Sequence, residues 1–288
     1  MRTVWTLTRM TFREAIRRRI VLTGLVLGVC FLAIYSVGFH EVTTQIRRAS
    51  QTMAAESGNR SFGGIARTEG VNILALAGLY AVTFLSVAMG ALLGADTLAG
   101  EINSGTIQTI VAKPIRRSDV VLGKWLGFAG LLGLYLLLTA GGTILSVWTQ
   151  SGYAPNHVLA ALGLIYLEAL LIMTISLACS SSFSSLAAGG IVFGLYGLAF
   201  IGGWIEQFGP LLQNDAAVKV GIVTSLIIPS ESLWRRAAFE VQTPLASALG
   251  MSPFSAISVP SPLMIAYAVV YLLVTLSIAI HTFQKRDL

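Results

Sequence analysis

The most isolated chemical group in the sequence is the carboxylate of Glu168, near the middle of a long apolar run. An ionisable side chain inside a membrane is costly, so Glu168 is by default a functional candidate. The alternative is a glutamate that fixes helix packing through hydrogen bonds with Tyr135, Thr139 or Thr143. We favour packing, because a single carboxylate without a partner makes no proton relay.

A serine-rich run over residues 180–185 offers hydroxyl groups of the kind that nucleophilic enzymes use. The natural base would be a histidine, but His40, His157 and His281 fall at or beyond the ends of apolar runs. We therefore interpret the run as a turn whose hydroxyls cap helices, and predict no catalytic residues. The histidines are far apart and no CxxC or HxxxH pattern occurs, so we predict no metal site.

ATP binding by this chain is also not expected. Gly123 and Lys124 precede Trp125 instead of Ser or Thr, and Ser118 stands where a phosphate-binding loop needs its first glycine. Any energy from ATP would have to come from another subunit.

The composition predicts an integral membrane protein. Of 288 residues, 55% are hydrophobic and 11% are charged, with a mean hydropathy of +0.77. Soluble domains carry about 25% charged residues. The net charge is +6, but the basic residues flank apolar runs instead of forming one folded basic face, so nucleic acid is not an expected partner.

One polar stretch interrupts the apolar runs, over residues 94–124. We expect Asn103 and Ser104 to cap the start of a short helix there, and Pro114 to end it at Lys113. Ser118 and Asp119 would cap the next span. The apolar side of this amphipathic helix comprises Ile102, Thr106, Ile107, Ile110 and Val111. Such a helix rests either on lipid headgroups or on a soluble partner.

The order of residues in this stretch resembles the "E…GT…P…R…GK" signature of ABC-2 type permeases, the membrane subunits of ATP-binding-cassette transporters. The signature residues here are Glu101, Gly105, Thr106, Pro114, Arg117, Gly123 and Lys124. The resemblance implies a coupling helix in a groove of an ATPase subunit, formed by Glu101, Gly105, Thr106, Ile107, Ile110, Val111 and Pro114. It also implies that ATP and Mg²⁺ are bound by two copies of the ATPase, with no cofactor in this chain, and that a second permease chain completes the pathway.

The predicted fold is an all-α membrane protein with six spans. The N-terminal residues form an interfacial helix whose arginines meet anionic lipid headgroups. We expect a polar external loop over 40–70 with one helix around 42–55, and two short outer helices, around 218–228 and 231–241. In order, the segments are 1–19 (interfacial helix), 20–39, 71–94, 125–148, 158–179, 186–205 and 263–280 (spans), 95–119 (coupling segment) and 206–261 (outer loop).

The distribution of positive charge predicts that both termini face the cytoplasm. With that orientation the inner segments hold Arg2, Arg9, Arg13, Arg17, Arg18, Arg19, Lys113, Arg116, Arg117, Lys124, Lys285 and Arg286, which are 12 of the 19 basic residues. The resemblance to ABC-2 type permeases implies an exporter subunit in a bacterial inner or plasma membrane. Two other classes remain open: an ion-driven secondary transporter, and a membrane-embedded enzyme or maturation factor of the kind linked to copper.

Overall fold

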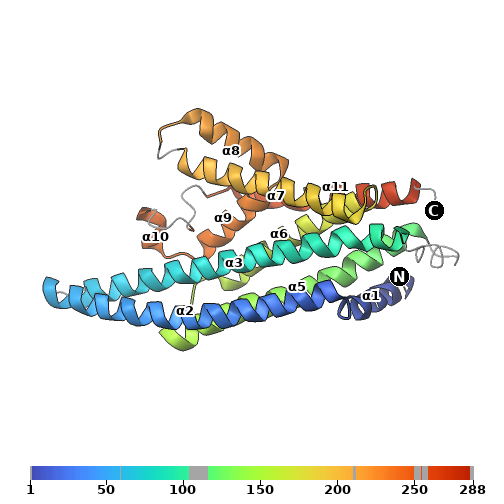
Figure 1. Cartoon of the computed structure of the whole chain (residues 1–288). Coiled ribbons are helices and arrows are strands. Elements are labelled where there is room, and N and C mark those ends of the chain that lie inside the picture. The colour runs from blue at the N-terminus through green and yellow to red at the C-terminus, as the bar shows by residue number, and fades with distance from the viewer. Residues whose placement is uncertain are drawn as a thin grey trace.

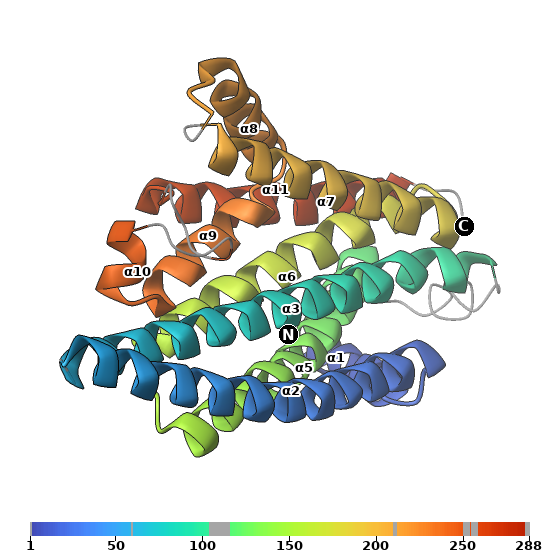
Figure 2. The same cartoon turned by 60° about the vertical axis from the view of Figure 1, so that its left-hand side comes forward.

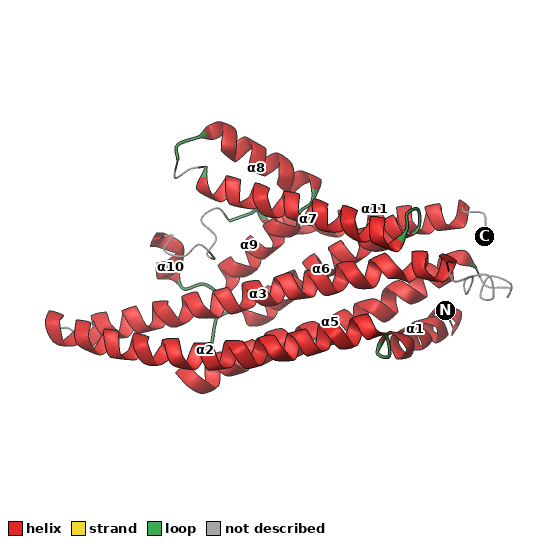
Figure 3. Ribbon diagram, in the orientation of Figure 1, coloured by secondary structure: helices red, strands yellow, loops and turns green. Residues whose placement is uncertain are grey.

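The computed structural model describes residues 2–58, 60–103, 116–209, 212–249, 254 and 259–285. Every regular element in these ranges is a helix, as the apolar runs predict (Figure 3). In chain order the helices are α1 (Arg2–Ala15), α2 (Arg19–Ser57), α3 (Arg60–Asn103), α5 (Arg117–Ser151), α6 (Val158–Ser180), α7 (Ser185–Phe208), α8 (Asp215–Ile227), α9 (Ser230–Val241), α10 (Pro244–Leu249) and α11 (Pro262–Lys285).

Six of the described helices are long and apolar enough to cross a membrane, namely α2, α3, α5, α6, α7 and α11. This confirms the predicted six-span, all-helical fold. Helix α6 packs against α3, α5, α7, α9 and α11, so it lies at the centre of the bundle (Figure 2). The N- and C-terminal ends of the chain lie at the same end of the bundle (Figure 1), as an even number of crossings requires. That this end faces the cytoplasm stays a prediction.

Helices α2 and α3 form a hairpin that is longer than expected. The residues between 40 and 70, predicted as an external loop, continue both helices up to a turn at Gly58, whose φ is 63°. The helices persist because they pack closely. A Cβ on Gly63 would lie 2.5 Å from the carbonyl oxygen of Ser50, and a Cβ on Gly70 would lie 3.0 Å from Ile46. The polar residues after the first apolar run end the lipid-facing stretch, but helix α2 continues through them.

The predicted interfacial helix over residues 1–19 is shorter in the structure. Helix α1 ends at Ala15, and after a short elbow Arg19 begins α2. Helix α1 packs along the first half of α5. The close approach depends on glycines of α5, since a Cβ on Gly123 would lie 2.6 Å from Cβ of Leu7.

The two short helices expected between the fifth and sixth spans are present as α8 and α9. They meet at a bend of 102°, which is the geometry of a broken span or a re-entrant loop. Helix α8 lies along α7, while α9 turns inward against α6 (Figure 2). The largest apolar core cluster joins α9 to the spans through residues such as Leu233 and Trp234.

Candidate coupling platform and buried polar clusters

The residues on either side of the predicted coupling helix are held by one apolar cluster, here called the coupling platform. It lies where α3 ends and α5 begins, and α6, α11 and α1 pack around it. All its core members are buried; they are Leu98, Val120, Val121, Leu177, Leu276 and Phe283. Because the cluster draws on four spans, a displacement of either flank has to move against α6 and α11.

Polar contacts add to the coupling platform. The Arg18 guanidinium, at the elbow between α1 and α2, lies 3.5 Å from a carboxylate oxygen of Asp96 in α3. The hydroxyl of Ser185, at the start of α7, donates to Asp96 over 3.3 Å. Asp96 thus connects the elbow, α3 and α7. At the other flank, the side chain of Arg117 donates to the main-chain oxygen of Gln284 in α11 over 3.0 Å.

The structure places only part of the predicted coupling segment. Glu101 lies in the last turns of α3. Gly105, Thr106, Ile107, Ile110, Val111 and Pro114 lie outside the described residues. Asn103, expected to cap the start of a new helix, is instead the last residue of α3, because α3 runs on beyond its apolar part.

The start of α5 also differs from the prediction. Its N-cap is Arg116, which makes no capping hydrogen bond, in place of the expected Ser118 and Asp119. Asp119 lies in the first turn of α5, where a negative charge still favours the helix dipole. The serine-rich turn is as expected, since the backbone N–H of Ala187 donates to the Ser184 hydroxyl at the start of α7.

Glu168 is fully buried in α6. Neither of its carboxylate oxygens has a hydrogen-bond partner among the described residues. The expected partners do not reach it, because the Thr139 hydroxyl donates to its own helix at Tyr135 and the Thr143 hydroxyl donates to Thr139. A second buried acidic side chain, Glu231, lies on α9, which packs against α6. The packing role of Glu168 stays a prediction.

A second polar cluster, which the sequence did not predict, ties α7, α8 and α9 together. A guanidinium nitrogen of Arg235 lies 2.7 Å from a carboxylate oxygen of Glu206. The Ser225 hydroxyl of α8 donates to the other oxygen of Glu206 over 3.2 Å, and Arg235 also donates to Ser232 over 3.3 Å. We call Glu206, Ser225, Ser232 and Arg235 the α7–α9 polar cluster.

Both ions of that cluster are removed from solvent, with side-chain exposures of 4% for Arg235 and 11% for Glu206. Such a pair holds one geometry, because separating the partners leaves buried charges without compensation. No sequence signal indicates this pair, because Glu206 and Arg235 are 29 residues apart and lie on different helices.

A third polar contact joins α3 to the turn before α6 and to α9. The side-chain amide of Asn72 donates to the Tyr153 hydroxyl over 2.8 Å and to the main-chain oxygen of Val241 over 3.3 Å. Burial raises the pKa of the Tyr153 phenol, so this hydroxyl stays neutral.

Comparison with known proteins agrees with this architecture. Residues 5–288 match the model of the ABC-2 family transporter protein. The chain is 29% identical over 148 residues to "Probable ABC transporter permease protein NosY" of Stutzerimonas stutzeri, a match that covers 51% of this chain and 46% of that protein. The protein of the same name from Pseudomonas aeruginosa is 29% identical over 147 residues, with the same two shares.

The chain thus spans about half the length of the curated relatives it matches, whereas the family model extends over nearly all of it. The family match includes the coupling platform, the α7–α9 polar cluster and the six long apolar helices. On that match the chain belongs to the ABC-2 family of transporter proteins.

Proposed function

We propose that this chain is the permease subunit of an ABC exporter, driven by ATP hydrolysis on two separate ATPase subunits. Two such permease chains, identical or closely related, would form the pathway, since six spans are half of the usual set. The family and the permease relatives support the membrane-subunit role. The exporter direction, the ATPase pair and the second chain are our inference.

The observation that carries the proposal is the coupling platform. Residues 104–115 connect the end of α3 to the start of α5. These two flanking segments pack against α6 and α11 in one cluster of fully buried side chains, such as Leu98, Val121 and Phe283. A force applied to this segment would therefore reach several spans at once, as a rigid-body switch requires. The Asp96 contacts extend the same linkage to α7 and the elbow.

The experiment replaces the apolar side of the coupling segment. The double variant Ile107→Asp, Ile110→Asp should insert normally, since neither residue lies in a predicted span. Burial of each side chain is worth roughly 1.5–3 kcal/mol. We therefore expect ATPase binding to weaken by about a hundredfold or more. The measurement is recovery of the ATPase with the permease from detergent-solubilised membranes.

A matched control carries the same two aspartates far from the segment, at Gln45 and Thr52, which are both exposed on α2. That variant should keep the full ATPase yield. If the Ile107 and Ile110 variant also keeps the full yield while its insertion is normal, the partner docks elsewhere. A segment that rests on lipid headgroups instead predicts that result.

A further inference from the structure

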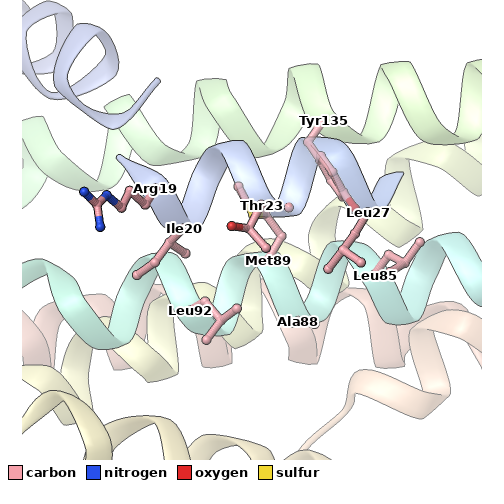
Figure 4. A pocket seen from close by; sticks show the side chains of 10 residues that line it. Arg19, Ile20, Thr23, Leu27, Leu85, Ala88, Met89, Leu92 and Tyr135 are labelled. Atoms are coloured by element: carbon pink, nitrogen blue, oxygen red, sulfur yellow. The ribbon is translucent and has the colours of Figure 1, made fainter. Parts of the chain in front are cut away.

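A narrow apolar groove lies between α2 and α3, close to the elbow that follows α1. Figure 4 shows its length, from Arg19 and Ile20 at one end to Leu27 and Leu85 at the other. Its volume is about 260 Å³. That is below the roughly 300–1,000 Å³ of sites for drug-sized ligands, so the groove suits one slender chain.

The groove has a rigid floor. A Cβ on Gly24 would lie 2.6 Å from the sulfur of Met89, so α2 and α3 approach closely at this point because residue 24 has no side chain. Tyr135 of α5 lies beneath them and is almost fully buried. The walls above the floor are aliphatic, with Leu27 on α2 and Leu92 on α3.

The groove opens toward lipid. Only 11% of the residues in the most apolar window of α2 are buried inside the chain, compared with 56% for α3. Leu27, which lines the groove, is about half exposed, at 54%. In a bilayer, hydrocarbon chains therefore border this opening.

A cation stands at the mouth of the groove. At the elbow, Arg18 is occupied by Glu14 over 2.8 Å and by Asp96 over 3.5 Å. Its neighbour Arg19 is exposed and makes no hydrogen bond or ion pair that the structure shows within the described part of the chain. Figure 4 shows its guanidinium extending past the end of the groove, beyond Ile20. An apolar slot that ends at an unneutralised cation complements an amphiphile with an anionic head.

We propose that this groove binds an anionic phospholipid, with one acyl chain between α2 and α3 and the phosphate at Arg19. The acyl chain would lie over the floor that Gly24 and Met89 form, between the side chains of Leu27 and Leu92. It would also neutralise a charge beside the elbow from which Arg18 reaches Asp96 and the coupling platform. The inference needs only the membrane location of the chain, so it does not depend on transport direction or on the ATPase.

A second copy of the chain is the main rival occupant. In a two-fold contact across this groove the elbows of both copies would come near each other, and each carries three consecutive arginines, Arg17 to Arg19. The acidic residues that the structure places at the elbow, Glu14 and Asp96, already face Arg18. The charge therefore favours a lipid over a like-charged protein surface.

The experiment places the full chain in nanodiscs of phosphatidylcholine and adds trace amounts of a lipid with a photoactivatable acyl chain. The probe carries either a phosphatidylglycerol or a phosphatidylcholine headgroup, and labelled peptides are mapped by mass spectrometry. We expect the phosphatidylglycerol probe to label residues 20–27 and 85–92 about fivefold more strongly, the factor that corresponds to about 1 kcal/mol for one basic contact.

Two variants separate the headgroup contact from the chain contact. Arg19→Gln should remove the preference between probes, while Arg9→Gln, a change at an exposed arginine of α1 that does not line the groove, should keep it. Ala88→Trp should fill the groove and abolish labelling of these residues by both probes. Ile34→Trp, at an exposed position of α2 outside the groove, should leave labelling unchanged.

Equal labelling by the two probes in the unmodified chain would overturn the proposal, because lipid that surrounds a protein without a specific site shows no headgroup preference. It would equally be overturned if Ala88→Trp left the labelling in place. Efficient disulfide formation between two copies through a cysteine at Leu27 would assign the groove to a protein contact and exclude the lipid. Fluorescence-detected size exclusion shows for each variant that the chain is folded, so a lost signal is not mistaken for a lost protein.

Discussion

At the end of the bundle that carries both chain ends, the spans meet through apolar side chains, with Leu98, Val121 and Phe283 buried in one cluster. Where α7, α8 and α9 meet, the packing is built instead around the ion pair of Glu206 and Arg235. The hydrophobic effect is non-directional, whereas a buried ion pair is favourable in only one geometry. We therefore expect the coupling platform to move as a body and the α7–α9 polar cluster to hold a discrete state.

The largest effect should follow from removing the cation of the α7–α9 polar cluster. Arg235→Met leaves the Glu206 carboxylate buried without its partner, which costs about 3–5 kcal/mol of stability. The melting temperature in detergent should fall steeply. The double variant Glu206→Met, Arg235→Met should recover much of that loss, because no unpaired charge then remains.

The neighbouring arginine supplies the control. Arg236 pairs with Glu240 over 2.9 Å, but both side chains are about a fifth exposed, so Arg236→Met should cost no more than about 1 kcal/mol. Equal destabilisation by the two single variants would show that burial of the ion pair does not distinguish this region from the rest of the bundle.

A smaller effect is expected from crowding the coupling platform at the contact of α1 with α5. Gly123→Ala places a methyl group 2.6 Å from Cβ of Leu7, and overpacking of this kind costs about 1–3 kcal/mol. Gly141→Ala, on the same helix, meets nothing within 4 Å and should stabilise by up to about 1 kcal/mol. Thermal unfolding of the two variants gives the difference directly, and a stable Gly123→Ala protein would contradict the close packing of α1.

The smallest change in stability should come from Glu168→Gln. A fully buried carboxyl group without a charged partner favours its neutral form, and the amide keeps the shape and polarity of that form, so stability should change by less than about 1 kcal/mol. If Glu168 serves packing, reconstituted transport should also be retained. A variant that is stable and assembled but does not transport would instead show that the carboxylate of Glu168 handles charge during transport.

Cysteine probes perturb the chain least and determine which end faces which compartment. After Cys30 and Cys179 are replaced, a cysteine at Gly105 should resist membrane-impermeant maleimide in intact cells, while a cysteine at the exposed Gly58 should react. This pattern follows from the excess of basic residues in the predicted inner segments. Labelling at residue 105 from outside would invert the orientation and move the coupling platform away from ATP.

Much of the fold follows from the sequence because a bilayer crossing needs about twenty apolar residues, and six runs meet that need. The helical structure of residues 40–70 was not predicted from the sequence. Polar residues indicate where the lipid-facing part of a helix ends, but a helix can continue beyond that point. Glu168 was visible because it interrupts an apolar run. The pair of Glu206 and Arg235 was not, because it joins a span to a short helix through tertiary contact. The link from Arg18 to Asp96 was hidden for the same reason.

The length of α2 has a mechanical consequence. With 39 residues the helix is about 58 Å long at 1.5 Å per residue, nearly twice the roughly 30 Å of the hydrocarbon core. The hairpin of α2 and α3 is therefore a lever whose far tip, at the Gly58 turn, stands clear of the lipid. A tilt of about 10° around the middle of a helix this long displaces its tip by about 5 Å. Spin labels beside that turn would register small rearrangements of the spans as large changes in distance.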